Sequence, residues 1–248
     1  MANLSTALRI LKEDGPAHVL AAAVEYLARP HGFSFSAQLQ QTAPAVADPF
    51  DHIYAANGWL SGESRSGPGS ERSYTAPYRE QLTALIGDRG IRSMFDAPCG
   101  DLNWIWDVVE RTGISYIGGD IAEGAIADAR RRVPQATVSV FDIAKDAFPQ
   151  VDLWHCRDCL FHLSFEQVHA AFDNFLAAGI PFALITTHKA RYLRNRDIAP
   201  GGFRYLDLQR APFGLPKPLS YLSDYRKGRD FPRFVALWSR EQVEAALS

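Results

Sequence analysis

The sequence of 248 residues is poor in cysteine, lacks a long apolar run and carries almost no excess of charge. Three cysteines, an odd number in a chain of this length, do not predict a disulfide framework. The apolar run 19–28 contains Glu25 and is too short to cross a bilayer, and no signal peptide is recognisable. A formal net charge of -2 gives no reason to expect a nucleic-acid partner. We therefore expect a cytoplasmic protein with neither a membrane nor a nucleic acid as its partner.

The composition, with 47% hydrophobic and 22% charged residues, is that of a globular chain that can bury a substantial core. Apolar residues recur at helical spacing in 4–11 and 18–28, whereas 31–50 has little periodicity and is typical of a linker. We predict an N-terminal helical cap and linker over 1–50, followed by one larger domain over 51–248. The N-terminal helices are expected to cover that domain or to form a contact in a homodimer.

The stretch 93–105 is the centre around which the larger domain is expected to form. A short apolar run is followed by Pro98 and Gly100, which favour a turn, and by Asp101, which is suited to cap the next helix. This order predicts a strand, a tight turn and a helix. A turn of small residues between a strand's carboxyl end and a helix's amino end is where doubly wound α/β folds bind nucleoside cofactors.

Aspartates stand at the ends of three successive short apolar runs. Asp96 ends the first, Asp120 follows the run 114–117 and a pair of glycines, and Asp142 follows the run 138–141. Asp120 comes about twenty residues after the first turn, where such folds place an acid on ribose hydroxyls. Since the carboxyl ends of parallel strands share one edge of a sheet, these runs predict a row of three carboxylates along that edge.

The three strand ends resemble those of the class I S-adenosylmethionine-dependent methyltransferases. The resemblance continues in 151–158, which is similar to the family's fourth strand and its tip. It extends through the loop 160–163 and through 183–187, which is similar to the fifth strand, and covers roughly residues 77–240.

The resemblance implies a Rossmann-like, doubly wound α/β domain with a seven-stranded, mostly parallel sheet and an antiparallel final strand. The N-terminal helical extension predicted from the apolar spacing would precede it. It also implies S-adenosylmethionine as the cofactor and S-adenosylhomocysteine as the product. The family's first turn usually has glycine at alternate positions. Here Pro98 and Leu102 stand at the outer two positions and Gly100 at the middle one.

Residue by residue, the resemblance gives the strand ends a role in binding the cofactor. Asp120 would accept hydrogen bonds from the ribose hydroxyls, and Asp142 would bind the adenine amino group, with Ile143 packed on the ring. Asp96 and Gly100 would shape the turn near the methionine moiety. Taken singly, each aspartate is also explained as a turn or cap residue. The contacts implied in this part of the chain are Asp96, Pro98, Gly100, Asp120, Ile121, Asp142, Ile143 and Arg157.

The segment 53–70 is rich in glycine and serine but also contains Trp59 and the oppositely charged Glu63 and Arg65. It is either a flexible linker or a loop that folds over the methionine end of the cofactor. Glycine and serine allow a close approach of the backbone and leave amides free for a carboxylate, and the tryptophan and charged pair favour this second interpretation. The cofactor contacts predicted in this loop are Arg65, Ser66 and Gly67.

Asp158 and His162 lie in the predicted turn after the fourth strand and are the first candidates for catalysis. Histidine titrates near neutrality and can take a proton from an acceptor hydroxyl, while a neighbouring carboxylate can orient its ring. We therefore predict His162 as the general base and Asp158 as its partner; the alternative is that His162 packs structurally against the cofactor. His188, at the end of the fifth strand, is the other candidate base.

His155, Cys156, Cys159 and His162 bring four side chains of the kind that bind zinc into one short segment. Strand alternation sends His155 and Cys156 to opposite faces of the sheet, and structural zinc sites usually draw on two separated segments. No metal site is therefore predicted.

The segment that follows the fifth strand contains more basic than acidic residues and occupies a usual substrate region of the resembled family. Its basic residues are Lys189, Arg191, Arg194, Arg196, Arg204 and Arg210. A basic run is usually a solvated face, but here it favours a small polar acceptor that is anionic or contains a sugar.

We predict methyl transfer to a hydroxyl of a sugar, glycan or sugar nucleotide. The alternatives are N-methylation of a small molecule and a noncatalytic cofactor-binding module. No Asn-Pro-Pro-Tyr motif follows the fourth strand, which weakens amino methylation of a nucleic acid.

Overall fold

The structure, a computed structural model, describes residues 49–189, 194–226 and 230–247. The predicted N-terminal helices and nearly all of the predicted linker lie outside these residues. The described chain begins with helix α4, Pro49–Ala55, so the predicted boundary between residues 50 and 51 falls within a helix. None of the helices in the described part of the chain is long and apolar enough to cross a membrane.

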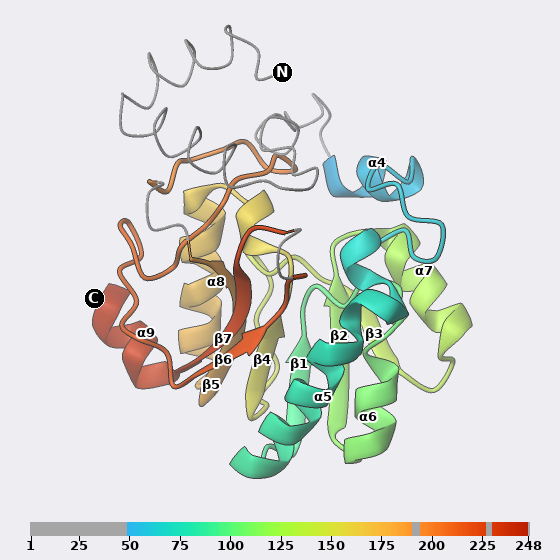
Figure 1. The fold of residues 1–248 in the computed structure, drawn as a ribbon, viewed down its shortest axis with the longest axis horizontal. Helices are drawn as coiled ribbons and strands as arrows, with labels where there is room; N and C mark the ends of the chain where they lie inside the picture. Colours follow the sequence, from blue (N-terminus) through green and yellow to red (C-terminus); the bar gives the residue numbers. More distant parts are fainter. Residues whose placement is uncertain (1–48, 190–193, 227–229, 248) are drawn as a thin grey trace, which may run out of the picture.

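A central sheet has helices on both of its faces (Figure 1). Its strands are β1 Ser93–Asp96, β2 Ser115–Asp120, β3 Thr137–Val140, β4 Leu153–Cys156, β5 Phe182–His188, β6 Ser220–Ser223 and β7 Arg233–Ser239. The strand order is β3-β2-β1-β4-β5-β7-β6; β1 to β5 pair in parallel, and β7 is antiparallel to both β5 and β6. The predicted Rossmann-like sheet with an antiparallel final strand is confirmed.

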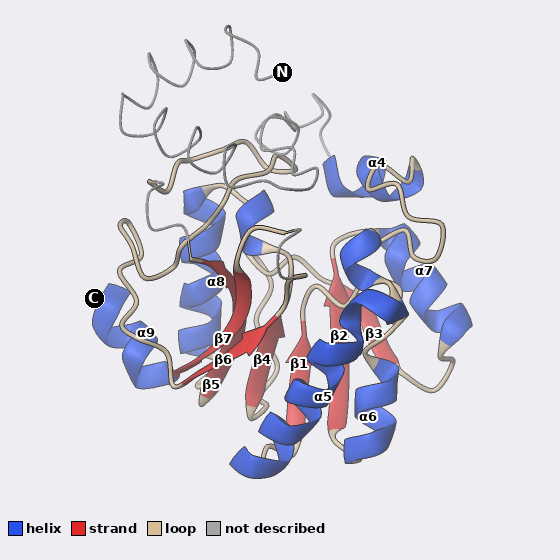
Figure 2. Ribbon diagram, viewed as in Figure 1, coloured by secondary structure: helices blue, strands red, loops and turns tan. Residues whose placement is uncertain are grey.

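Helices α5, α6 and α7 cover one face of the sheet, and α8 and α9 cover the other (Figure 2). Their bounds are α5 Arg72–Arg89, α6 Trp106–Thr112, α7 Glu123–Arg132, α8 Phe165–Ala177 and α9 Arg240–Leu247. Strand alternation explains the two layers: Met94 and Leu153 pack toward α5 to α7, whereas their neighbours Phe95 and Trp154 pack toward α8. Parallel strands buried on both faces therefore need apolar residues at nearly every position.

The described part of the long segment between β5 and β6, residues 194–219, belongs to the core although it forms no helix. Leu206 and Phe213 are fully buried on the α8 side of the sheet. The side-chain amide of Asn195 donates to the backbone carbonyl oxygen of Asp207 at 2.8 Å. The prediction that the apolar content of this segment orders it is confirmed.

The helix after the first turn begins later than the sequence predicts. Helix α6 starts at Trp106 and its N-cap is Ile105, so the prediction that Asp101 caps it is wrong. Asp101 is buried and accepts hydrogen bonds from the Ser64 hydroxyl at 2.9 Å and from the Asn103 amide at 3.3 Å. This carboxylate therefore holds the segment before α5 against the first turn.

The predicted capping box at the start of α8 is present. The Gln167 amide donates to the Ser164 hydroxyl at 3.2 Å, and the Ser164 amide donates to the Gln167 side chain at 3.1 Å. We expect Ser164→Ala to lower the free energy of unfolding by about 1 kcal/mol, because a helix amide loses its acceptor. Urea denaturation measures the loss. Ser73→Ala, at an exposed position of α5, is the control and should leave stability unchanged or slightly higher; equal losses would contradict the role of the box.

Candidate active site

A cavity of about 510 Å³ lies at the carboxyl ends of β1 to β4. The turns after these strands line it together with parts of the segment 58–70, which connects α4 to α5. The predicted cofactor contacts that line it are Ser66, Gly67, Asp96, Pro98, Gly100, Asp120, Ile121, Asp142, Ile143 and Arg157. Arg65 is exposed and is not among the lining residues, so the structure does not bring it into the predicted site.

The first turn has two residues in the left-handed backbone region although it has only one glycine. Gly100 has φ 58° and Leu102 has φ 56°, so both lie in the left-handed region that favours glycine. Leu102 is 2% exposed, and burial of its side chain offsets the strain of this conformation. Leucine at the third position of the turn is therefore compatible with a left-handed backbone there.

Asp120 connects the turns after β1 and β2. One carboxylate oxygen accepts from the Gly100 amide and the other from the Ala122 amide, each at 2.9 Å. Burial raises the pKa of Asp120 to about 6, although both hydrogen bonds work in the opposite direction. Each oxygen keeps a second lone pair, so the carboxylate can still accept hydrogen bonds from a ligand.

Asp142 lies just beyond β3, which ends at Val140, and is therefore on a turn. Its carboxylate accepts from the Ala144 amide at 2.9 Å and pairs with the Lys145 ammonium at 2.9 Å. Ile143 is buried beside it and also lines the cavity. An acid and an apolar surface thus lie together at this end of the cavity.

Asp96, at the end of β1, is held by buried side chains from β4 and β2. Nδ1 of His155 lies 2.6 Å from one carboxylate oxygen, and the Tyr116 hydroxyl donates to the other at 2.8 Å. The Tyr78 hydroxyl of α5 lies 2.8 Å from Nε2 of the same histidine. Since all four side chains are buried, this chain of polar groups fixes a carboxylate in the cavity wall without exposing it.

His155 and Cys156 lie on opposite faces of the sheet, as strand alternation predicts. The His155 ring packs with Tyr78 and Trp104, whereas Cys156 lies in the cluster on the α8 side. Within the described residues, no three His, Cys, Asp or Glu side chains are grouped so that they could hold a metal ion.

The segment 58–70 is held in place by side-chain hydrogen bonds. Glu63 accepts from the Asn103 side chain at 2.6 Å and from the Arg72 amide at 2.8 Å. Trp59 packs against the start of α7 and lines the cavity. These contacts favour the interpretation of a loop that covers the cavity over that of a flexible linker.

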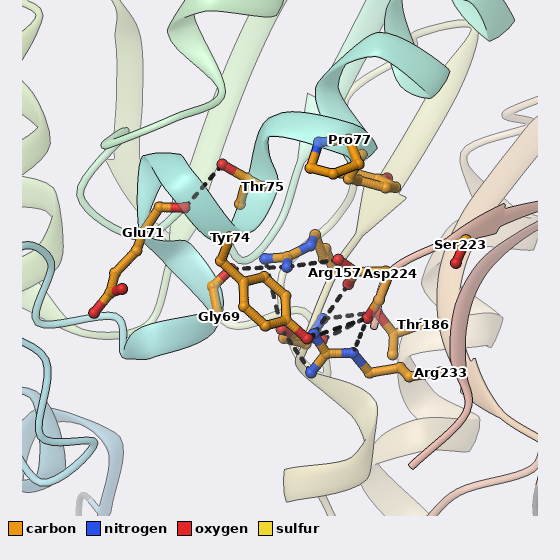
Figure 3. A network of polar contacts seen from close by, with 12 residues as sticks. Gly69, Glu71, Tyr74, Thr75, Pro77, Arg157, Thr186, Ser223, Asp224 and Arg233 are labelled. Atoms are coloured by element: carbon orange, nitrogen blue, oxygen red, sulfur yellow. Dashed lines mark hydrogen bonds and ion pairs between the residues drawn. The ribbon is translucent and has the colours of Figure 1, made fainter. Parts of the chain in front are cut away.

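Two arginines and two aspartates cluster beside the tip of β4: Arg157 and Asp158 follow that strand, Asp224 follows β6, and Arg233 begins β7. Figure 3 labels Arg157, Asp224 and Arg233 and shows hydrogen bonds and ion pairs among them. Arg157 donates to Asp224 at 2.9 Å, and Arg233 lies 3.2 Å from both Asp158 and Asp224. Asp158 has φ 57°, and its amide donates to the Thr186 hydroxyl at 2.9 Å. Burial alone would raise the pKa of Asp158, but the guanidinium groups of Arg233 and Arg157 hold it below its ordinary value. The cavity wall therefore carries an ionised carboxylate here.

His162, in the short helix η2 Leu160–His162, lines the cavity with one ring nitrogen already engaged. Nδ1 lies 2.6 Å from the Gly202 carbonyl oxygen, so Nδ1 carries the proton and the neutral ring keeps a lone pair on Nε2. Burial lowers the pKa of His162 below its ordinary value, which favours this neutral form near pH 7. The Gly202 carbonyl orients the ring and Asp158 is engaged by arginines, so the prediction that Asp158 orients His162 is wrong.

His188 is not among the residues that line the cavity. Its Nδ1 accepts from the Leu206 amide at 3.2 Å, so the neutral ring carries its proton on Nε2 and has no lone pair there. Burial lowers the pKa of His188 to about 3, and the ring packs against Phe161 and Tyr205. The structure therefore does not bring this second candidate base to the site.

The basic residues of the segment after β5 do not form a basic wall around the cavity. None of Lys189, Arg194, Arg196, Arg204 and Arg210 is a lining residue, and Arg191 lies outside the described residues. Arg204 is buried and donates to the carbonyl oxygens of Leu163 and Leu160, so it holds η2 in place. In the described part of the chain the arginines that line the cavity are Arg157 and Arg233, and both are paired with aspartates. The prediction of an anionic acceptor therefore loses its support.

Sequence reasoning did not identify an aromatic wall around His162. The ring centroids of Trp59 and Phe203 lie 6.3 Å and 5.8 Å from that of His162, and Phe50 also lines the cavity. These residues come from three segments that meet only in the folded chain. Single aromatics in irregular segments carry no periodic signal, and Trp59 stood out only because its neighbours are small and polar.

Gly100 is a position where a side chain is expected to be costly. An added Cβ would lie 2.5 Å from Oγ of Ser66. We expect Gly100→Ala to lower the free energy of unfolding by about 2 kcal/mol, through left-handed strain and overpacking together. Adding Ser66→Gly removes the clash and should restore about half of this loss.

Urea denaturation of the two single variants and the double variant measures the coupling between Gly100 and Ser66. Gly113→Ala is the matched control, because Gly113 has φ 65° and an added Cβ would have no neighbour within 4 Å. It should show only the strain, about 1 kcal/mol. Absence of coupling between the two residues would contradict the contact.

Neither a protein-family profile nor a curated protein matches the sequence. Solved structures resemble it in fold. Magnesium protoporphyrin IX methyltransferase from Synechocystis PCC 6803 with bound S-adenosylmethionine aligns with a TM-score of 0.56 at 12% identity, over 79% of this chain and 99% of that chain. The N-methyltransferase NodS from Bradyrhizobium japonicum WM9 aligns with a TM-score of 0.52 at 14% identity, over 67% of this chain and 96% of that chain. The chain therefore has the fold of S-adenosylmethionine-dependent methyltransferases.

Proposed function

We propose that the chain is an S-adenosylmethionine-dependent methyltransferase that acts on a small polar acceptor. One observation carries the proposal: Asp142 just beyond β3, Asp120 at the end of β2 and Asp96 at the end of β1 come from adjacent strands and line one cavity, and His162 lines the same cavity. An extended nucleoside ligand along this edge would meet Asp142, then Asp120, then the turn at Gly100. The shared fold adds support, because a structure with this fold was solved with S-adenosylmethionine bound.

The residues of the cavity fit this cofactor. A volume of about 510 Å³ lies within the range of roughly 300–1,000 Å³ that is typical of small-molecule sites. The Ser66 hydroxyl is buried at the cavity with no hydrogen-bond partner in the protein, so a polar atom of a ligand could satisfy it. Glycine at position 69 leaves room for the neighbouring Asp158 carboxylate in the cavity wall, since an added Cβ would lie 3.0 Å from it.

Asp142 and Ile143 would hold the adenine, Asp120 the ribose, and Asp96 and the first turn the methionine moiety. When bound, the cofactor supplies a methyl group on a positively charged sulfur. The protein's own task is to hold the acceptor in line with that methyl group and to remove its proton. Nε2 of His162 would take the proton, because Nδ1 is engaged by the Gly202 carbonyl, and the ionised Asp158 would stabilise the imidazolium.

For the acceptor we propose a hydroxyl of a sugar, glycan or sugar nucleotide. A free lone pair on Nε2 of His162 suits a hydroxyl proton, and the nearby rings of Trp59 and Phe203 offer apolar surface to a sugar ring. N-methylation of a small molecule is the second candidate, since NodS, which shares the fold, is an N-methyltransferase.

Asp120→Ala is expected to weaken the binding of S-adenosylhomocysteine by about 1.5 to 3 kcal/mol, the scale of hydrogen bonds to a charged group. Calorimetric titration of the purified protein measures the change. Asp173→Ala, at an exposed position of α8, is the control and should leave the affinity as it is. The same affinity in wild type and Asp120→Ala would refute the role of the strand-end carboxylates.

The wild-type affinity should also depend on pH. Because the pKa of Asp120 is raised to about 6, its carboxylate becomes protonated below that pH and accepts fewer hydrogen bonds. Affinity should be constant above about pH 7 and should fall toward about pH 5. This decrease should be smaller in Asp120→Ala.

His162→Ala is expected to slow methyl transfer by about a hundredfold or more while leaving cofactor affinity nearly intact. Release of S-adenosylhomocysteine in the presence of a pool of sugars and sugar nucleotides reports the rate. His169→Ala, on α8 and not among the cavity residues, is the control. A normal rate in His162→Ala would mean that positioning alone drives the reaction. Tight binding without turnover of any acceptor class by wild type would indicate a noncatalytic cofactor-binding module.

A further inference from the structure

We propose that Asp224, which is not a lining residue of the cavity, is a positioning residue for the methionine end of the cofactor. It acts through the guanidinium groups of Arg157 and Arg233. Asp224 follows β6 in the sequence and is 2% exposed. The inference rests on the proposed function and adds to it the group that fixes one wall of the site.

The strand order decides which end of the cofactor this wall would meet. Asp142 follows β3, Asp120 ends β2 and Gly100 follows β1, so adenine and ribose bound at the first two would leave the amino-acid portion for β1 and its other neighbour. That neighbour is β4, whose tip carries Arg157 and Asp158. The methionine end would therefore lie against the cluster of arginines and aspartates.

Arg157 connects Asp224 to the segment that covers the cavity. One guanidinium nitrogen donates to the Asp224 carboxylate at 2.9 Å and also to the Gly69 carbonyl oxygen at 2.8 Å (Figure 3). The guanidinium carbon lies 5.4 Å and 5.2 Å from the ring centroids of Tyr78 and Trp104. The rings fix the plane of the guanidinium, and Asp224 fixes its direction within that plane.

Arg233 connects the same carboxylate to the tip of β4. Its guanidinium lies 3.2 Å from Asp224 and 3.2 Å from Asp158, and it donates to the Tyr74 hydroxyl at 3.0 Å. Asp224 therefore holds both guanidinium groups, one directed at Gly69 and the other at Asp158. Without its charge, two buried arginines would share the single carboxylate of Asp158, which is a costly arrangement.

Gly69 lies beside Asp158, so the two guanidinium groups act on one part of the cavity wall. An added Cβ at Gly69 would lie 3.0 Å from the Asp158 carboxylate. Both residues line the cavity, whereas Asp224 does not. A change at Asp224 should consequently alter binding at this end of the site and leave the turns after β2 and β3 unaffected.

The test compares two ligands, S-adenosylhomocysteine and 5′-methylthioadenosine, which keeps the adenosine but lacks the amino-acid portion. In Asp224→Asn, the dissociation constant of S-adenosylhomocysteine should rise about tenfold, since a charged hydrogen-bond partner is lost from the wall. The constant of 5′-methylthioadenosine should stay within about twofold. Asp120→Ala should weaken both ligands, because both contain the ribose.

Asp152→Asn is the matched control for general destabilisation. Asp152 accepts from the amides of Arg92 and Ser93 at the opposite end of β1, at 2.8 Å and 3.0 Å. The Asp152→Asn variant should have a lower melting temperature than wild type but the same ratio of the two dissociation constants. Asp224→Asn should change that ratio.

Equal weakening of both ligands in Asp224→Asn, or no change in either, would overturn the positioning role while the proposed function stands. Failure of wild type to bind either ligand would overturn the proposed function itself and this inference with it. If Asp224→Asn does not fold, Arg157→Lys decides the question. A lysine keeps the charge but lacks the planar fork that holds Asp224 and Gly69 together, and it should show the same selective loss.

Discussion

The site depends on holding buried carboxylates at the edge of an apolar sheet. A buried charge is costly unless hydrogen bonds or an opposite charge satisfy it, so each strand-end aspartate needs its own partners. Asp96 is satisfied by two buried side chains, Asp120 by two backbone amides, and Asp158 by two guanidinium groups. Because those partners come from neighbouring strands, turns and helices, satisfying the carboxylates also fixes the shape of the cavity.

The three kinds of partner that satisfy the buried carboxylates have different consequences for chemistry. Backbone amides hold Asp120 without neutralising it, so burial raises its pKa toward the physiological range. Guanidinium groups keep the pKa of Asp158 low, so that this carboxylate stays charged beside His162. The β2 end of the cavity is thus suited to accept hydrogen bonds, and the β4 end is suited to stabilise positive charge.

Backbone partners also determine what the two candidate histidines can do. His162 meets a carbonyl oxygen at Nδ1, and His188 meets an amide hydrogen at the same atom. The first ring therefore presents a lone pair at Nε2 and the second a proton. The two histidines lie close to the ends of neighbouring strands, yet only His162 can accept a proton at Nε2. The difference comes from the backbone group that each ring meets at Nδ1.

The sequence by itself determined the strands, because apolar runs and turn residues are local signals, and it placed Asp96, Asp120 and Asp142 at strand ends. The seven-stranded, mostly parallel sheet with an antiparallel final strand came from resemblance to a family, and the structure confirms it. Only the tertiary structure decided which polar groups meet: Arg157 with Asp224, His162 with the Gly202 carbonyl, and Asp101 with Ser64 instead of a helix end. These partners are 67, 40 and 37 residues apart, and no periodic pattern encodes such pairs, because their meeting depends on how the whole chain packs.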